Sequence, residues 1–387
     1  MELIYFDNAA TSWPKPGGIT EAMTAYHANV GASPGRSGHR LSLAAGRIML
    51  SARESLANLF GIGDPLRIVF TKNATEALNL VIFGLLKPGD HCITSSMEHN
   101  ALMRPLRTLE SQGLEMTVIP CSEQGELDPG RIVPAIKSTT KAVFLTHASN
   151  VTGTIMPIAE VGRIARDHGL VFCVDAAQTA GTMPLDIEET GIDLLAFTGH
   201  KALFGPQGTG GLYIRPGIED KLHPLMMGGT GSRSEFELQP DFLPDKYESG
   251  TPNTVGLAGL EAGVRFILET GIRAIREKEI QLTAEFLEGL RSIPGIALHG
   301  PVEASRRTAV VSFTLEGMHP SEVALALDEE FGILSRPGLH CAPAAHKTIG
   351  TFPIGTNRFS FGYFNTAEEI TYTLEALAEM SRRVASG

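Results

Sequence analysis

The stretch AFTGHKALFGPQGTGGLYI, residues 196–214, decides how the chain folds. It opens with a short apolar run that predicts a buried strand, and Lys201 follows that run directly, ahead of a turn rich in glycine and proline. GGLYI then predicts a second strand. Burial lowers the pKa of a lysine amine and leaves it free to react with a carbonyl group. The alternative is an exposed loop lysine, which this stretch alone does not exclude.

Upstream of this stretch, short apolar runs alternate with helical periodicity. The predicted strands are 66–71, 91–96, 115–120, 141–149, 170–177, 193–199 and 210–214. The predicted helices between them are 74–86, 100–112 and 157–169. This alternation predicts an α/β fold with a mostly parallel central sheet, whose ligands bind at the carboxyl ends of the strands.

Beyond about residue 255 the pattern changes to long helical stretches and shorter strands, one of them at 333–337. We therefore predict a large domain over 17–254, a smaller α+β domain over 255–387 and an N-terminal arm over 1–16. The segment 228–254 is rich in glycine, proline and serine and predicts a long irregular connection, which in compact proteins is usually functional or at an interface.

Composition narrows the classes of function. The 387 residues include 32 Lys and Arg against 43 Asp and Glu, a net charge of −11, which argues against nucleic-acid and anionic-membrane binding. No apolar run approaches the roughly 20 residues of a membrane span. The N-terminus lacks the pattern of a secretory signal, so we expect a cytoplasmic protein.

The four cysteines do not form a CxxC pair and argue against a disulfide framework. Cys92, Cys121 and Cys173 end or lie within apolar runs and are expected to be structural. Cys341 differs, because it lies in the turn-like sequence RPGLHCAP beside His340. No metal site is expected.

Asp175 ends the apolar run of VFCVDAAQTAG, residues 171–181. A carboxylate there is costly unless a cation pairs with it, and the pyridinium nitrogen of pyridoxal phosphate (PLP) is such a cation. Gln178 could then reach the phenolic oxygen of that cofactor. A helix N-cap is the alternative role for Asp175.

Three more strand ends carry polar groups. In IVFTKNATEALN the backbone N–H groups around Asn73, Ala74 and Thr75 open a helix and could bind a phosphate, although ordinary capping is the alternative. His99, in SMEHNAL, could stack on a flat ring or move protons, or be structural. Asn150, in THASNVTGT, also lies at the end of a predicted strand. The order anion-binding turn, histidine, asparagine, aspartate, lysine is the layout expected of a PLP site.

The chain resembles the class V aminotransferase-fold enzymes of fold type I, and within them the cysteine desulfurases and selenocysteine lyases. The resemblance runs nearly end to end, through YFDNAATSWP, TKNATEALN, EHNA, SNVTG, VDAAQ, TGHKALFGPQGTG, YESGTPNT, RPGLHCAP and NRFSFGYFNT. RPGLHCA is similar to the short-loop, SUF-type (group II) desulfurases. The resemblance implies a large domain built on a mostly parallel sheet and a smaller C-terminal domain.

The resemblance also implies a PLP site. Lys201 would hold PLP covalently, Asp175 would pair the pyridinium nitrogen, and His99 would stack on the ring and help move protons. The other implied contacts are Ala74, Thr75, Thr198 and His200 at the phosphate, Gln178 at the phenolic oxygen, Asn150 near that oxygen and the substrate, and Thr251 at the phosphate of the neighbouring subunit. A homodimer with shared active sites follows from the last of these.

On the substrate side, Arg358 would bind the carboxylate, a task suited to a guanidinium, with Arg336 also at the substrate. Cys341 would be the nucleophile that takes sulfur from L-cysteine as a persulfide and releases L-alanine. His340 and Arg336 would favour its thiolate. The sulfur would then pass to an acceptor protein or a small thiol, in sulfur metabolism and iron–sulfur cluster assembly.

Other functions share part of this pattern. A selenocysteine lyase, acting on L-selenocysteine, could use every residue named; an aminotransferase or a kynureninase-like hydrolase would not need Cys341; a non-catalytic scaffold would not bind PLP and would be colourless. The sequence departs from some short-loop relatives at Leu339 and over 342–350, and 228–240 fits only loosely. His39 and Arg40 are expected near the substrate mouth.

Overall fold

The computed structural model describes residues 3–35 and 37–386. Its central sheet has seven strands. The strands are β2 (Ile68–Thr71), β3 (His91–Ser95), β4 (Glu115–Ile119), β5 (Thr140–Thr146), β6 (Val171–Asp175), β7 (Leu194–Thr198) and β8 (Gly210–Ile214). Their order is β2-β8-β7-β6-β5-β3-β4, and β8 runs antiparallel to both of its neighbours while the others run parallel. The predicted mostly parallel sheet is confirmed.

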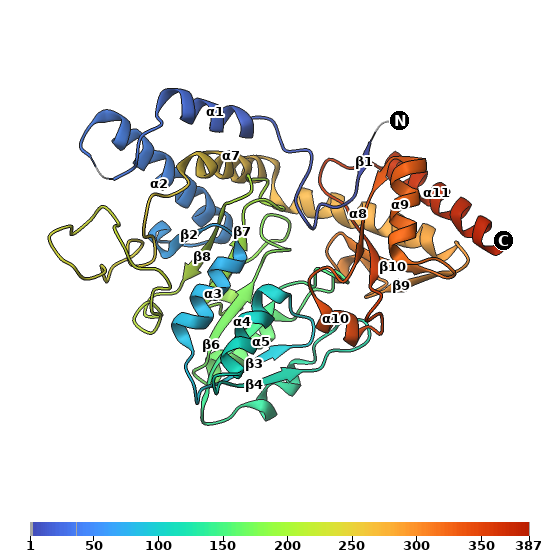
Figure 1. The fold of residues 1–387 in the computed structure, drawn as a ribbon, viewed down its shortest axis with the longest axis horizontal. Coiled ribbons are helices and arrows are strands. Elements are labelled where there is room, and N and C mark those ends of the chain that lie inside the picture. The colour runs from blue at the N-terminus through green and yellow to red at the C-terminus, as the bar shows by residue number, and fades with distance from the viewer. Residues whose placement is uncertain (1–2, 36, 387) are drawn as a thin grey trace.

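Helices cover both faces of this sheet (Figure 1). They are α1 (Ile19–Asn29), α2 (Arg40–Phe60), α3 (Ala74–Leu85), α4 (Asn100–Glu110), α5 (Ile158–Asp167), α6 (Ile187–Thr190) and α7 (Thr254–Thr270), with short 3-10 turns η1 (Pro65–Arg67), η2 (Pro129–Arg131) and η3 (Val133–Ala135). The sequence analysis did not predict α1 or α2. The strands are apolar on both sides because both faces are covered.

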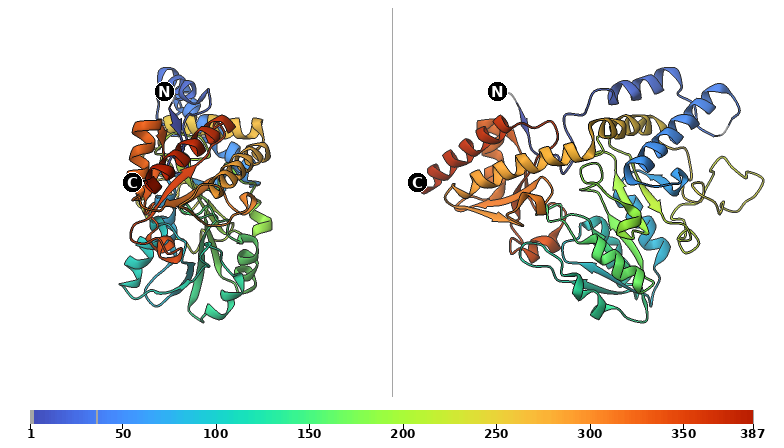
Figure 2. Two further views of the ribbon diagram at one scale, coloured as in Figure 1. Left: turned by 90° about the vertical axis from the view of Figure 1, so that its right-hand side faces the viewer. Right: turned by 180° about the vertical axis from the view of Figure 1, so that it is seen from behind.

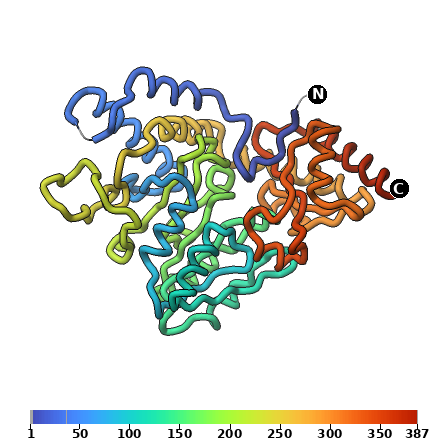
Figure 3. The backbone as a smooth tube through the Cα atoms, viewed as in Figure 1, coloured from blue at the N-terminus to red at the C-terminus, as the bar shows by residue number. Residues whose placement is uncertain are grey.

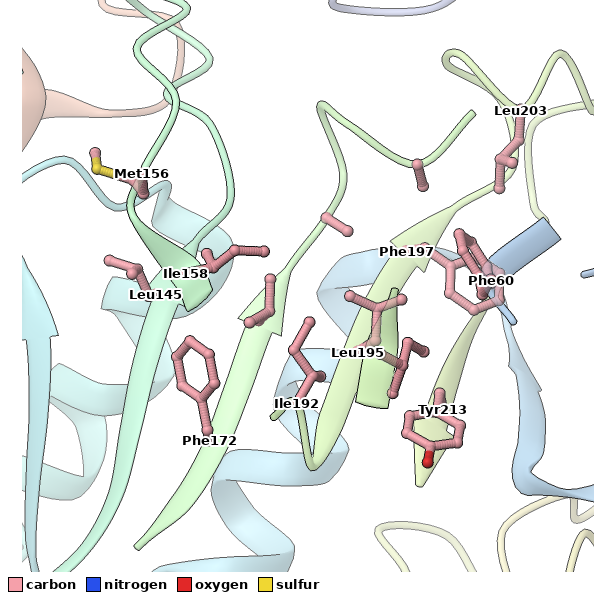
Figure 4. Close-up of a cluster of buried hydrophobic side chains, with 14 of the residues drawn as sticks. Phe60, Leu145, Met156, Ile158, Phe172, Ile192, Leu195, Phe197, Leu203 and Tyr213 are labelled. Carbon is pink, nitrogen blue, oxygen red and sulfur yellow. The ribbon is translucent and has the colours of Figure 1, made fainter. Parts of the chain in front are cut away.

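Successive side chains along these strands point to opposite faces of the sheet and belong to two separate apolar clusters. Leu145 and Phe172 point to the face covered by α2, α5 and α7, where Figure 4 shows them with Phe197 and Phe60. Their neighbour Phe144 packs on the opposite face, with α3 and α4. The buried Cys92 and Cys173 belong to this second cluster, as expected of structural cysteines.

The C-terminal part is built on a second, four-stranded sheet of order β12-β13-β10-β9. Its elements are α8 (Ile272–Arg291), β9 (Ile296–His299), η4 (Ala304–Arg306), β10 (Val310–Leu315), α9 (Pro320–Phe331), β12 (Arg336–Gly338), α10 (Pro343–Thr348), β13 (Thr356–Ser360) and α11 (Ala367–Ser386). Phe286, Phe313 and Phe359 lie in its core. Figure 2 shows this part beside the central sheet from two further directions.

The prediction of a single strand at 333–337 is wrong. The chain forms two short strands there, β11 (Ile333–Leu334) and β12, which belong to different sheets. β11 pairs in parallel with the N-terminal strand β1 (Ile4–Tyr5), whereas β12 pairs antiparallel with β13. The strand divides at Ser335 because its two ends have different partners.

The domain limits stay a prediction. The predicted boundary at 254/255 falls at the first residue of α7, but α7 packs against α1 and α2, and Leu257 and Leu260 join the cluster under the central sheet. The irregular connection extends over 215–253. Among the described residues, no helix combines the length and apolar character needed to cross a bilayer.

Candidate active site

A cavity of about 260 Å³ lies at the carboxyl ends of β3, β5, β6 and β7, where the second sheet faces the first. It brings together nearly all the predicted site residues. Those that line it are Ala74, Thr75, His99, Asn150, Asp175, Gln178, Thr198, His200, Lys201, Arg336, Cys341 and Arg358.

Lys201 is the third residue after β7, in the turn that leads into β8. Its side chain is half-buried and lines the cavity. Burial is the main cause that lowers its pKa to about 8, helped by the charges of Arg358 and Arg336 and opposed by Asp175. An amine with this pKa is partly neutral near neutral pH, so it can act as a nucleophile or a base.

Asp175 is the last residue of β6 and is buried. Its Oδ1 accepts a hydrogen bond from Ala177 N–H at 2.9 Å, the local contact expected of a capping aspartate. Burial raises the pKa of this carboxyl, and the nearby charge of Lys201 lowers it. A cation beside Asp175 in the cavity would favour its charged form.

A set of unpaired polar groups faces the start of α3. Asn73 caps this helix through a hydrogen bond to Glu76 N–H, and the first N–H groups of any helix have no partner within it. Among the described residues, Thr198 Oγ1 and His200 Nδ1 are buried without a hydrogen-bond partner. Gly210 of β8 packs directly against the backbone at the start of α3, because a Cβ there would lie 2.7 Å from Asn73 Cα. The unpaired donors and the helix end fit a phosphate.

His99 caps the next helix, α4, and its Nδ1 accepts a hydrogen bond from Ala101 N–H at 3.0 Å. Burial, aided by the positive charges of Lys201, Arg358 and other nearby residues, lowers its pKa to about 4. The ring is therefore neutral at neutral pH, with its proton on Nε2. A neutral flat ring on the cavity wall fits an aromatic cofactor.

Together these groups fit PLP: an amine for its carbonyl, a carboxylate for its pyridinium nitrogen, a flat ring and a phosphate subsite. Two predicted contacts are engaged within the protein. Gln178 Nε2 donates to the carbonyl of Ala9 at 3.2 Å, and Asn150 Nδ2 donates to the carbonyl of His340 at 2.7 Å.

Cys341 is exposed at the edge of the same cavity, between the buried residues His340 and Ala342. His340 and Cys341 have φ values of +48° and +59°, a left-handed conformation that is uncommon outside glycine. Two hydrogen bonds hold this backbone: Asn150 to the carbonyl of His340, and Asn100 N–H to the carbonyl of Cys341 at 2.8 Å. Strain of this kind is common at functional sites.

The expectation that His340 supports a thiolate is wrong. Its side chain is buried, and burial together with the charges of Arg358, His346 and Arg336 keeps its pKa far below the ordinary value. The ring is neutral and donates or accepts a hydrogen bond with Thr356 Oγ1 at 3.1 Å. Positive charge near Cys341 therefore comes from the arginines. Burial lowers the pKa of Arg358, and the negative charge of Asp7 opposes that shift.

Arg358 lies buried on β13, opposite Arg336 on β12. Its Nη2 donates to Asp7 Oδ1 at 2.7 Å and its Nη1 to the carbonyl of Asn150 at 3.0 Å. Among the described residues, Arg358 Nε is buried without a partner and Arg336 makes no ion pair. Two adjacent guanidinium groups with free N–H donors suit a carboxylate.

Three predicted residues lie elsewhere. His39 caps α2 and Arg40 begins it, both are exposed, and neither lines the cavity of its own chain, so their place near the substrate mouth stays a prediction. Thr251 is exposed on the irregular connection and lines a separate cavity of about 440 Å³ near Arg53 and Glu248.

Sequence reasoning missed two features of this site. Glu98, next to His99, is fully buried, accepts hydrogen bonds from Ser95 Oγ and Thr146 N–H, and has a pKa raised by burial to about 8. Its signal was a charged residue at the end of an apolar run. Asp7 was the other, and no local pattern pairs it with Arg358, 351 residues away.

The chain is similar over nearly its whole length to proteins named probable cysteine desulfurase. The chain is 39% identical over 384 residues to a protein of Methanothermobacter thermautotrophicus named probable cysteine desulfurase, which covers 98% of this chain and 94% of that protein. A Pyrococcus abyssi protein of the same name is 37% identical over 394 residues, covering 100% of this chain and 96% of the other.

Solved structures agree on the fold. The apo structure of a cysteine desulfurase from Thermococcus onnurineus has a TM-score of 0.93 at 38% identity and covers 99% of this chain and 95% of that one. The cysteine desulfurase CsdA of Escherichia coli has a TM-score of 0.87 at 28% identity, with the same coverage. The expected resemblance and fold type I architecture are confirmed. A sequence profile described as aminotransferase class-V matches residues 4–373, and the chain belongs to this family.

Proposed function

We propose that the protein is a PLP-dependent cysteine desulfurase, which converts L-cysteine to L-alanine and takes the sulfur onto Cys341. The observation that carries the proposal is the exposed thiol of Cys341 on the same cavity as Lys201, Asp175 and Arg358. An aminotransferase has no use for such a thiol. The relatives named cysteine desulfurase match nearly the whole chain, which supports the same activity.

The chain supplies a group for each part of the cofactor. Lys201 would hold PLP, Asp175 would pair its pyridinium nitrogen, and His99 would lie against its ring. Thr198, His200 and the start of α3 would bind its phosphate, since their donors are free. PLP, when bound, withdraws electrons from the substrate and makes the proton on its α-carbon acidic.

Lys201 and the two arginines act on the substrate: the arginines bind its carboxylate, and Lys201 moves its α-proton. Arg358, through its free Nε–H, and Arg336 bind the substrate carboxylate and orient the α-carbon. Lys201, with a pKa of about 8, is close enough to neutral pH to accept the α-proton and return it later. His99 stays neutral and so adds no charge beside the ring.

Cys341 removes the sulfur. Its thiolate attacks the sulfur of L-cysteine, a sulfur–sulfur bond forms, and the bond between that sulfur and the β-carbon breaks. The electron pair of the broken bond stays on the carbon side, which takes up a proton to become the methyl group of L-alanine. L-Cysteine and the Cys341 thiol thus give L-alanine and a Cys341 persulfide, which passes its outer sulfur to an acceptor protein or small thiol.

We also propose that the active form is a homodimer. Large apolar side chains are exposed on α2 and on the irregular connection, among them Leu43 at 54%, Met227 at 72% and Leu238 at 83%. These two segments lie at the same end of the molecule (Figure 1). A second copy over this end would cover them and could bring its Thr251 to the phosphate subsite. Sedimentation at assay concentration checks this, and a fully active monomer would contradict it.

A product assay tests the function. Purified protein loaded with PLP is given L-cysteine or L-selenocysteine with a small thiol, and alanine, sulfide and selenide are measured. We expect alanine and sulfide in equal amounts from L-cysteine. Activity on L-selenocysteine alone would make the protein a selenocysteine lyase, and a protein that is colourless with PLP and inactive would overturn the enzyme assignment.

A further inference from the structure

Residues 7–15, here called the strap, run between β1 and α1 without forming a helix. In Figure 3 this dark blue segment leaves the C-terminal part of the molecule and crosses toward α1, which packs against α7. The mechanism proposed above gives the strap no role. Its hydrogen bonds nevertheless reach both sides of the active-site cavity.

At one end the strap holds the strand that carries the substrate arginine. Asp7 Oδ1 accepts from Arg358 Nη2 at 2.7 Å. Ala9 N–H donates to Ser360 Oγ at 2.8 Å, and Asn8 Nδ2 donates to the Ser360 carbonyl at 3.0 Å. The side chain and the backbone of β13 are therefore both tied to the strap.

At the other end the strap converges on one carbonyl oxygen, that of His200, directly before Lys201. This oxygen accepts from Ser12 N–H at 3.1 Å, Thr11 Oγ1 at 3.0 Å and Lys15 Nζ at 2.9 Å. Ser12 Oγ donates to the carbonyl of Lys201 itself at 2.8 Å. Ser12 Oγ also lies 3.3 Å from the His200 oxygen, so four donor atoms surround an oxygen that has two lone pairs, and the contact is crowded.

Lys15 is the unusual member of this group. Its ammonium also donates to Ser12 Oγ at 2.8 Å, yet no carboxylate of the described residues is close enough to affect it, and burial alone lowers its pKa to about 8. A half-buried ammonium without a counter-ion costs free energy. Its hydrogen bonds to the His200 carbonyl and to Ser12 Oγ are the contacts that offset this cost, and both lie at the backbone beside Lys201.

The backbone that Lys15 reaches has little freedom on its other side. Phe204 N–H donates to the Lys201 carbonyl at 2.8 Å, and Gly199 N–H donates to the Thr209 carbonyl at 2.8 Å. Gly205 leaves no room for a Cβ, which would lie 2.8 Å from a Leu260 methyl group. The strap supplies the remaining constraint on the Lys201 turn.

We propose that Lys15 is a positioning residue: through the carbonyl of His200 it fixes the backbone that carries Lys201, so that the strap sets Lys201 relative to Arg358. The role of Lys201 and Arg358 in this statement rests on the proposed function. Misplacement of a reacting group by about 1 Å can cost roughly a hundredfold in rate.

The test uses Lys15→Met, which nearly keeps the length of the side chain and removes its donors. The control is Lys141→Met, at an exposed lysine near the amino end of β5, away from the cavity. Two quantities are measured on the full-length, PLP-loaded protein: hydrogen–deuterium exchange of the peptide 199–205, and kcat and KM for L-cysteine. For Lys15→Met we expect faster exchange in this peptide and a kcat lower by about tenfold to a hundredfold, with KM nearly unchanged. Lys15→Arg, which restores a donor, should recover part of both.

The proposal is overturned if Lys15→Met matches Lys141→Met in exchange, or if exchange rises and kcat does not fall. If Lys15→Met does not fold, Thr11→Val removes a second donor to the same carbonyl and is judged by the same two readouts. If the wild type releases no alanine from L-cysteine, the proposed function fails, yet the exchange of 199–205 still reports whether Lys15 holds this turn.

Discussion

The turn that carries Lys201 and the loop that carries Cys341 face one cavity, but they are built in opposite ways. The Lys201 turn is tied on one side to the strap and on the other to Thr209, and Lys201 itself is half-buried. Cys341 is exposed, although His340 and Ala342 on either side of it are buried. His340 and Cys341 are both in the left-handed conformation, and their carbonyls accept from the Asn150 side chain and the Asn100 N–H. A proton-transferring amine gains from a fixed and dehydrated position, whereas a sulfur-carrying thiol must be reachable by an acceptor.

The largest expected effect is on the fixed side. Lys201→Ala removes both the covalent link to PLP and the base, so we expect no measurable turnover and no attached PLP, with the fold intact by circular dichroism. Borohydride reduction and peptide mapping of the wild type should label Lys201. A label on another lysine would show that the buried turn is not the attachment site.

The next effect is on the exposed side. Cys341→Ala should keep the yellow colour, lose activity on L-cysteine by roughly 10³-fold or more, and retain appreciable activity on L-selenocysteine, because selenium leaves carbon more readily than sulfur. Wild-type protein treated with L-cysteine should carry one extra sulfur on the peptide that contains Cys341.

Cys121→Ala, at a half-buried cysteine that does not line the cavity, is the matched control and should behave as the wild type. Sulfide release by Cys341→Ala at the wild-type rate would contradict the role of Cys341 as the nucleophile.

The pH dependence of PLP attachment tests the surroundings of Lys201. The amine reacts only when unprotonated, and its pKa of about 8 lies below the ordinary 10.5. After mixing cofactor-free protein with PLP, the attachment rate should rise about tenfold per pH unit below pH 8, since each unit deprotonates ten times more amine, and level off above it. A rate that keeps rising to about pH 10 would mean that the turn is as exposed as the Cys341 loop.

A smaller effect is expected at the phosphate subsite. Thr198→Val removes a buried hydroxyl that has no partner among the described residues, so the cofactor-free protein should be as stable as the wild type or slightly more stable. PLP affinity should fall by about tenfold or more, because a hydrogen bond to a charged group contributes about 1.5–3 kcal/mol. Thermal denaturation with and without PLP measures both, and equal losses in the two states would contradict the assignment.

Much of the fixed side could be predicted from the sequence, because the carboxyl ends of parallel strands meet at one edge. Asp175, His99 and Lys201 each follow an apolar run, and that rule alone places them together. The start of α3 was also predictable from Asn73 and the helical periodicity after it.

The exposed side was harder to predict, because it depends on contacts distant in sequence. Nothing local pairs Asp7 with Arg358 or sets Asn150 against the loop of Cys341. The charge of His340 was misjudged because burial, which decides its pKa, is a property of the folded chain. The strand predicted at 333–337 divides because its two parts pair with strands that lie elsewhere in the sequence, β1 and β13.

The antiparallel strand β8 limits how the chain can change in length during evolution. Because β7 and β8 are neighbours in the sheet, both ends of the Lys201 turn are anchored, and a Cβ on Gly199 would lie 2.1 Å from Thr209 Oγ1. An inserted residue between Gly199 and Gly205 would therefore move the lysine, whereas Gln207 and Gly208 at the tip of the turn are exposed. The spacing from Thr198 to Gly205 should accordingly stay constant in evolution.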